Sequence, residues 1–511
     1  MSIGSRRSEP ARAGARSPML AVVATVAILS ACMPARPATP RPPMLASAID
    51  AIIDSPPFHR AQWGILFVDA STGRLLYARD PERLFVPASN AKLATAATAL
   101  QELGPEFRYR TRIYATAGPE DSVAAGLLVR ASGDPSMSER FQAGSYAVMD
   151  SLADSLVVAG IRRITGAVVV DASYFVGEAI RPSWEVGDIG QPYAPPTGAF
   201  GVEEATVQVA VRPGGTPGES GLVDTAPVPG LVDIDNRVRT GPIGSPIELT
   251  FERGPVGSEL IVSGSVPAGG DSVVVRTVAV PDPNEHAARA LLAALRSRGI
   301  TAAHAVVLPD SAEAWALAGS SAGSQPVLVA TWTSPALGEI LRALLKESQN
   351  WIAEQVTKTV GAEVGGEGSW EAGLEAQRRF LIDVVDIDSA AFVLRDGSGL
   401  STKNLLAPAA AVALLDHARR APWDDAFLAG LPIAGTDGTL ETRLAPLRGR
   451  VYAKTGTLTH VNALSGYGWT LTGREALFSI VTNASGRPAA EMRDAMDRVV
   501  ELVLTGDTVT Q

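Results

Sequence analysis

Cysteine is almost missing from this chain of 511 residues, in which Cys32 is the only one. A single cysteine excludes an intramolecular disulfide, and it excludes thiol catalysis and cysteine-based metal sites in the rest of the chain. Histidine is also scarce, and the five histidines show no His-x-x-x-His or His-Glu pairing of the metalloprotease type. We therefore expect neither a metal nor another cofactor.

Positive charge is also in short supply. Lysine and arginine total 44 against 54 aspartate and glutamate residues, which gives a net charge of −10. Such a chain lacks the basic footprint of nucleic-acid-binding proteins, so nucleic acid is not an expected partner. The hydrophobic content of 46% and charged content of 19% indicate a globular chain. The length predicts about two to four domains.

Lysine is the rarer of the two basic residues. Only five of the 44 basic residues are lysines, so arginine serves wherever any positive charge will do. An ammonium group can lose its proton when it is desolvated, whereas a guanidinium cannot. A lysine kept against this bias is therefore a candidate for chemistry. The five are Lys92, Lys346, Lys358, Lys403 and Lys454.

The N-terminus has the pattern of an export signal. Four arginines precede an uncharged run of thirteen residues from Met19 to Ala31, which is too short to span a bilayer. Residues 1–31 therefore predict a signal peptide. The run ends in Leu-Ser-Ala before Cys32, which resembles the lipobox of bacterial lipoproteins, where the cysteine becomes the lipidated N-terminus. A Pro-rich tether at 32–44 would follow.

We accordingly expect an exported protein of the periplasm or cell envelope, held on a membrane by a lipid on Cys32. An ordinary signal peptide with a chance cysteine near its end is the alternative.

The remaining chain alternates between two kinds of secondary-structure pattern. Helical spacing and strand patterns mark the region up to about residue 107, with a hairpin at 63–79 and an alanine-rich helix ending at Gly104. From about 108 to 331, short apolar alternations broken by Gly and Pro predict a β-rich segment in which only 284–299 is clearly helical. Helices and strands then return. An α/β region is thus divided by a long β-rich insertion.

Three short motifs whose side chains could carry out catalysis occur in order along the chain: Ser89-Asn90-Ala91-Lys92, Ser348-Gln349-Asn350 and Lys454-Thr455-Gly456. Residues three apart on a helix share a face, so the Lys92 ammonium can reach the Ser89 hydroxyl. A serine hydroxyl becomes a strong nucleophile only when a base takes its proton. Lys92 can be that base if burial and a second cation lower its pKa. Lys454 is the candidate second cation.

The other motif residues complete a serine acyl-transfer site. Lys454 would also attract an anionic substrate group, with Thr455 and Thr457 donating hydrogen bonds to it. The backbone N–H groups of Ser89 and Thr457 could form an oxyanion hole. Ser348 would relay a proton to the leaving amine. Asn350 would fix both the lysine and the substrate amide.

Each residue alone also allows a purely structural interpretation. Ser89 could cap a helix, Asn350 could be a satisfied loop amide, and Lys454 could be a solvated strand lysine. The three motifs together, in order and in suitable local contexts, favour the catalytic interpretation.

With these motifs the chain resembles the penicillin-recognising serine acyl-enzymes. Within them it is similar to the D-alanyl-D-alanine carboxypeptidases/endopeptidases of the low-molecular-mass class C penicillin-binding proteins, which carry a long insertion between the first two motifs. Further similar stretches are residues 131–135, 193–195, 396–401 and 437–440. The resemblance covers about residues 45–505. Trp351, directly after the second motif, departs from the pattern.

The resemblance implies a β-lactamase/transpeptidase-like α/β domain, with an antiparallel sheet flanked by helices, interrupted by a β-rich insertion of two small domains. The implied boundaries are 45–107 and 326–505 for the catalytic domain, 108–200 and 280–325 for inserted domain II, and 201–279 for inserted domain III.

The same resemblance implies hydrolysis of the terminal D-Ala-D-Ala bond of peptidoglycan stem peptides, and of D-Ala cross-links, through a Ser89 acyl-enzyme. It makes Ser89, Lys92, Ser348 and Lys454 catalytic, and Asn350, Thr455, Gly456 and Thr457 substrate-binding residues. β-Lactams would be covalent inhibitors. A β-lactamase or esterase with the same acylation machinery, or a non-catalytic peptidoglycan-binding lipoprotein, are the alternatives.

Overall fold

The computed structural model describes residues 43–118, 120–253, 259–269, 273–320 and 325–506. The predicted signal peptide and the predicted lipidation site, Cys32, lie outside these residues, as does the predicted tether up to residue 42. The first helix, α1 (Pro43–Ile53), begins within the last two residues of the predicted tether. In the described part of the chain, no helix is both long and apolar enough to cross a membrane.

Both ends of the chain build one antiparallel sheet of five strands, in the order β17-β18-β19-β1-β2. β1 pairs with β19 along its whole length, from Gln62 opposite Asn483 to Asp69 opposite Ala476. The predicted hairpin and the predicted C-terminal strands are thus confirmed, and they lie in the same sheet. Its strands are β1 (Gln62–Asp69), β2 (Leu75–Arg79), β17 (Val451–Leu458), β18 (Val461–Trp469) and β19 (Glu475–Asn483).

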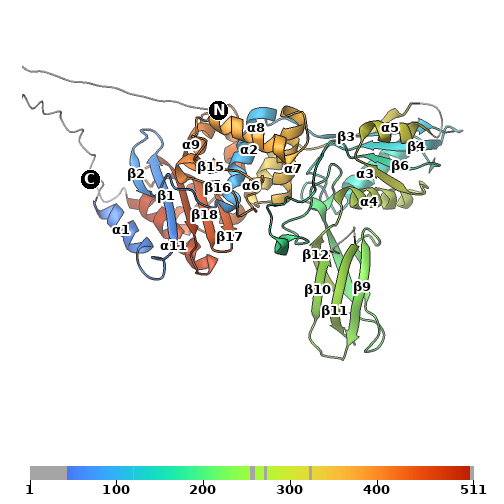
Figure 1. The fold of residues 1–511 in the computed structure, drawn as a ribbon, viewed down its shortest axis with the longest axis horizontal. Helices are drawn as coiled ribbons and strands as arrows, with labels where there is room; N and C mark the ends of the chain where they lie inside the picture. Colours follow the sequence, from blue (N-terminus) through green and yellow to red (C-terminus); the bar gives the residue numbers. More distant parts are fainter. Residues whose placement is uncertain (1–42, 119, 254–258, 270–272, 321–324, 507–511) are drawn as a thin grey trace, which may run out of the picture. The chain divides into compact units, whose positions relative to one another are not determined.

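Helices cover both faces of this sheet, so its central strands β18 and β19 are buried on both sides (Figure 1). Successive side chains of a strand point to opposite faces. In β19, Phe478 packs in the cluster that α1 and α11 complete, while Leu477 packs in the cluster of α2 and α9. The helices of this region are α2 (Ala91–Leu103), α6 (Leu337–Lys346), α7 (Asn350–Val364), α8 (Trp370–Arg379), α9 (Pro408–Ala418), α10 (Asp424–Gly430) and α11 (Ala489–Thr505). A small ladder pairs β15 (Phe392–Val393) with β16 (Leu405–Leu406).

Helix α2 lies at the centre of this helical layer. Its first ten residues are all buried. Most of them are alanine or threonine, which have small side chains, so neighbouring helices can approach closely on several sides. The predicted alanine-rich helix ending before Gly104 is therefore confirmed, and its start fixes the position of Ser89.

The insertion contains a six-stranded mixed sheet with the path β13-β6-β4-β3-β14, on which β5 pairs with β4. β14 pairs with β3, with Val327 opposite Ala115. The strand that follows the predicted boundary at residue 326, β14, therefore lies in this inserted sheet and not in the five-stranded sheet. Its strands are β3 (Arg110–Ala117), β4 (Val123–Arg130), β5 (Arg163–Ile164), β6 (Val168–Asp171), β13 (Ala305–Leu308) and β14 (Val327–Thr333).

Three helices accompany this sheet, α3 (Ala147–Val158), α4 (Pro283–Ser297) and α5 (Ser311–Ser320). The sequence predicted only α4, so the expectation of a single helix in the insertion was wrong. In α3 the buried residues include Val148, Leu152 and Leu156, which are spaced by four as on one helical face. The stretch with this helical spacing is short, and the strand patterns on either side of it make it easy to overlook.

Two three-stranded sheets complete the insertion, in the orders β12-β7-β8 and β10-β11-β9. They agree with the β-rich texture of the sequence. Their strands are β7 (Thr206–Arg212), β8 (Leu222–Ala226), β9 (Asp233–Gly241), β10 (Glu248–Arg253), β11 (Glu259–Pro267) and β12 (Val274–Ala279).

Candidate active site

Ser89 lies in a short 3-10 turn, Ala88–Asn90, that runs directly into α2. The turn is anchored to the five-stranded sheet, which is called the catalytic sheet below, because Asn90 Nδ2 donates a hydrogen bond of 2.6 Å to Ser465 Oγ on β18. Lys92 occupies the first turn of α2 and is fully buried. Its Nζ donates to Ser89 Oγ at 2.9 Å. The predicted contact between Ser89 and Lys92 is present.

Lys92 has two further acceptors. Its Nζ donates to Asn350 Oδ1 at 2.6 Å and to the backbone carbonyl of Ser398 at 2.7 Å. Burial lowers the pKa of Lys92 to about 7, although the nearby carboxylates of Glu354 and Asp396 act in the opposite direction. At neutral pH a large fraction of this amine can therefore lack its proton, as a general base must.

Ser348 and Lys454 form the second pair of the site. Ser348 lies in the connection between α6 and α7, where its φ of 62° is in the left-handed region. Lys454, on β17, is fully buried and donates to Ser348 Oγ at 2.8 Å and to the Thr455 carbonyl at 2.7 Å. Burial lowers the pKa of Lys454 well below its ordinary value, and the charge of Lys92 lowers it further.

The rest of the third motif lies on β17, an edge strand of the catalytic sheet. Thr455 Oγ1 donates to Thr439 Oγ1 at 2.7 Å, which connects the strand to the turn Gly438–Leu440. A Cβ added at Gly456 would lie 3.0 Å from the Pro87 carbonyl oxygen and 3.1 Å from the Ser89 backbone nitrogen. Thr457, the next residue, is exposed. The missing side chain at 456 thus lets β17 approach the Ser89 turn.

A loop at 396–404, buried except at residues 402 and 403, supports Lys92, and none of its residues was predicted as a site residue. Glu354 Oε1 accepts from the Ser398 N–H at 2.8 Å, and Glu354 Oε2 accepts from the Gly397 N–H at 3.0 Å. Asp396 accepts from the N–H groups of Gly399 and Ser401. These bonds hold the Ser398 carbonyl against Lys92. Burial and the charge of Asp396 raise the pKa of Glu354 to about 7.

The family resemblance included residues 396–401, so the sequence did point to this stretch of the chain. A backbone carbonyl that binds a lysine leaves no side-chain signature, and neither does the burial of a single glutamate. Ser398 and Glu354 could therefore be assigned only from the structure.

The insertion reaches the site through residues 193–201. Asn350 Nδ2 donates to the Tyr193 carbonyl at 2.8 Å, so this amide binds Lys92 with one end and the insertion with the other. Trp351 is buried, and its Nε1 donates to the Pro196 carbonyl at 3.1 Å. Its ring lies against Gly201, where a Cβ would come within 2.6 Å of it. Trp351 therefore packs on the insertion.

The site contains hydroxyl, amine and amide groups. Over the described ranges, no group of three or more His, Cys, Asp or Glu residues is arranged to hold a metal ion.

The chain is similar in sequence and in fold to known proteins. The family model of D-Ala-D-Ala carboxypeptidase 3 (S13) matches residues 45–503. A D-alanyl-D-alanine carboxypeptidase of Actinomadura sp. (strain R39) is 35% identical over 461 residues, which cover 87% of this chain and 82% of that protein. The carboxypeptidase DacB of Haemophilus influenzae is 24% identical over 425 residues, covering 81% of this chain and 84% of that protein.

A solved structure extends the likeness to three dimensions. The crystal structure of penicillin binding protein 4 (dacB) from Haemophilus influenzae superposes with a TM-score of 0.74 at 22% identity, covering 91% of this chain and 99% of that chain. This similarity confirms the predicted fold class.

Proposed function

Because the chain belongs to the D-Ala-D-Ala carboxypeptidase 3 (S13) family, we propose that Ser89 is the nucleophile with which it attacks its substrate. The protein is a serine-type D-Ala-D-Ala carboxypeptidase, a hydrolase. The observation that carries the assignment of Ser89 is the 2.9 Å hydrogen bond from a fully buried Lys92, because burial lowers the pKa of this amine and so leaves part of it unprotonated, and able to accept a proton, near neutral pH.

Acylation begins when neutral Lys92 takes the proton of the Ser89 hydroxyl. Ser89 Oγ then attacks the carbonyl carbon of the penultimate D-Ala, and the C–N bond to the terminal D-Ala breaks. Ser348, whose Oγ accepts a hydrogen bond from Lys454, relays a proton to the departing amine: it donates its own proton and regains one from the Lys454 ammonium, so the proton gained by Lys92 is balanced by the one that Lys454 loses. Water subsequently hydrolyses the ester on Ser89, which restores the free serine and releases the shortened stem peptide.

Substrate binding falls to the second and third motifs. Lys454, Thr455 and Thr457 bind the terminal carboxylate, and Asn350 binds a substrate amide. The N–H groups of Ser89 and Thr457 stabilise the oxyanion, because donors held in place before the reaction are worth most in a site that excludes water. The close approach of β17 at Gly456 supports this assignment.

The protein acts on peptidoglycan outside the cytoplasm. Residues 1–31 direct export, and lipidation of Cys32 then anchors the mature chain in the cell envelope through the Pro-rich tether. The basic N-terminal stretch, the uncharged run and the sequence before Cys32 support this proposal. Cleavage of D-Ala cross-links, an endopeptidase activity, uses the same acyl-enzyme, and β-lactams inhibit both activities by acylating Ser89.

Labelling of the purified mature protein with a fluorescent penicillin tests the assignment. The wild type should form a covalent adduct that Ser89→Ala and Lys92→Ala both lose, with mass spectrometry placing the adduct on Ser89. Digestion of isolated muropeptides should release D-Ala from pentapeptide monomers and divide cross-linked dimers. Adduct formation or hydrolysis by Ser89→Ala would refute the assignment, and rapid loss of the adduct would point to a β-lactamase.

A further inference from the structure

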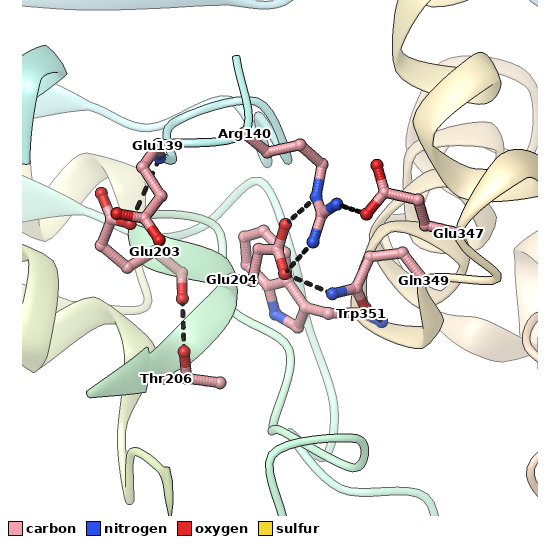
Figure 2. Close-up of polar contacts among 8 residues, drawn as sticks. All are labelled: Glu139, Arg140, Glu203, Glu204, Thr206, Glu347, Gln349 and Trp351. Carbon is pink, nitrogen blue, oxygen red and sulfur yellow. Dashed lines mark hydrogen bonds and ion pairs between the residues drawn. The ribbon is translucent and has the colours of Figure 1, made fainter. Parts of the chain in front are cut away.

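The Glu204 carboxylate connects the insertion to the loop of the second motif. Gln349, between Ser348 and Asn350, donates from its Nε2 to Glu204 Oε2. Arg140, also from the insertion, donates to Glu204 through Nε and, at 3.2 Å, through Nη2. Figure 2 shows the Arg140 guanidinium between Glu204 and Glu347, with Gln349 reaching Glu204 from the side of the catalytic helices. Glu204 is therefore a shared acceptor for the insertion and the catalytic loop.

Gln349 is fixed at both ends of its side-chain amide. Its Oε1 accepts from the Trp351 N–H at 3.0 Å, which caps the N-terminus of α7. Its Nε2 is the group that binds Glu204. Ser348 on one side has a left-handed backbone, a conformation that a non-glycine residue keeps only where its surroundings enforce it. Gln349 is placed to supply part of that constraint.

The backbone that carries Glu204 is itself held in an unusual conformation. Glu203, Glu204 and Ala205 have φ values of 50°, 57° and 54°, so three successive non-glycine residues lie in the left-handed region. The Glu203 carboxylate accepts from the N–H groups of Tyr146 at 2.8 Å and Glu139 at 3.2 Å. This turn is thus pinned within the insertion, and it presents Glu204 to Gln349 from a rigid support.

We propose that Glu204 is a positioning residue for the catalytic centre: through Gln349 it holds the loop so that Ser348 meets Lys454 and Asn350 meets Lys92. The two contacts that depend on this placement measure 2.8 Å and 2.6 Å. A displacement of about 1 Å in such a loop can cost a hundredfold in rate. The proposal rests on the function assigned to Ser89, Ser348 and Asn350 above.

Three variants of the full chain test the role of Glu204. Glu204→Ala removes the acceptor, and kcat for a D-Ala-D-Ala peptide should fall by about tenfold or more while KM changes by less than about threefold. Glu204→Gln keeps an oxygen for the Gln349 amide and should recover most of the lost kcat. Glu347→Ala is the matched control, because it removes the other carboxylate partner of Arg140 without touching Gln349. Its kcat should stay within about twofold of the wild type.

A double variant isolates the path through Gln349. If Glu204 acts through this side chain, Glu204→Ala combined with Gln349→Ala should be no slower than Gln349→Ala alone. All rates are measured at a temperature where thermal unfolding shows every variant to be folded.

Several outcomes would overturn the proposal. These are a wild-type kcat in Glu204→Ala, an equal loss in Glu347→Ala, no recovery in Glu204→Gln, or additive effects in the double variant. With penicillin still labelling Ser89 of the wild type, any of them leaves the proposed function intact. A wild type that forms no adduct would overturn the proposed function, and the positioning role with it.

Discussion

The backbone of Gly456 lies so close to Ser89 that a Cβ at position 456 would be 3.1 Å from the Ser89 nitrogen. This distance is shorter than ordinary van der Waals contact, and the nearest atoms, the Pro87 carbonyl oxygen, the Ala88 Cβ and the Ser89 nitrogen, cannot rotate away. The glycine of the third motif therefore lets the edge strand β17 pack directly against the turn that carries Ser89. Because this nitrogen is one of the two proposed oxyanion donors, the spacing between strand and turn bears directly on catalysis.

Gly456→Ala should slow acylation by about tenfold to a hundredfold, because the added methyl group pushes β17 from the Ser89 turn and opens the oxyanion hole. The rate of acylation by a chromogenic or fluorescent β-lactam measures the effect. Gly187→Ala is the control, since nothing lies within 4 Å of a Cβ at that position. Equal acylation rates in Gly456→Ala and the wild type would contradict the proposed geometry.

The acylation rate should depend on the protonation of Lys92. Its pKa lies near 7, and only the neutral amine can accept the Ser89 proton. The rate should therefore rise with pH, about tenfold per unit below pH 6, and level off above about pH 7. Acylation measured from pH 5 to pH 9 shows this. Lys92→Arg, whose guanidinium keeps its proton, should stay inactive throughout; a wild-type rate independent of pH would argue against Lys92 as the base.

Glu354→Gln should lower the free energy of unfolding by about 1–3 kcal/mol, because one of two carboxylate oxygens that accept buried N–H groups becomes an NH₂ group. If Oε1 is replaced, the Ser398 N–H loses its acceptor at 2.8 Å; if Oε2 is replaced, the Trp370 Nε1–H loses its acceptor at 2.7 Å. Urea unfolding at pH 8 measures the loss. Glu371→Gln, on the neighbouring helix α8, removes a carboxylate whose side chain is 72% exposed and should cost less than about 1 kcal/mol.

Trp351→Ala should destabilise the protein by about 3–5 kcal/mol, because the buried indole leaves a cavity between α7 and the insertion. Trp351→Phe keeps most of the apolar volume but loses the bond to the Pro196 carbonyl, so about 1–2 kcal/mol is expected. Chemical denaturation followed by circular dichroism separates the two variants. Equal stability of all three proteins would mean that this packing contributes nothing.

Much of the geometry of the candidate active site was predictable because its signals are local. Ser89 and Lys92 are three residues apart, and the alanine-rich pattern that follows them predicts the helix that brings them together. The alternating pattern around Lys454 likewise predicts the strand that carries it. Such short-range rules need no knowledge of the tertiary structure.

The parts that were not predicted depend on distant segments. The Ser398 carbonyl and the buried Glu354 support Lys92 only because helix α7 and the 396–404 loop pack beside α2. Glu204 contacts Gln349 from a strained turn with positive φ values. The residues of this turn are not glycine, so their types do not predict its conformation. In α3, a helical period of a few residues was outweighed by the strand patterns on either side.

The pairing of β1 with β19 has a consequence for biosynthesis. It makes neighbours of the first and last strands of the catalytic sheet, and the bond from the Val86 N–H to Asn483 Oδ1 joins residues 397 positions apart. A nascent chain that ends before β17 already contains Ser89 and Lys92 but lacks Lys454 and the strand beside the nucleophile. Closing so long a loop is also among the slower steps of folding. The enzyme therefore cannot begin to hydrolyse peptidoglycan until synthesis of its own chain is almost complete.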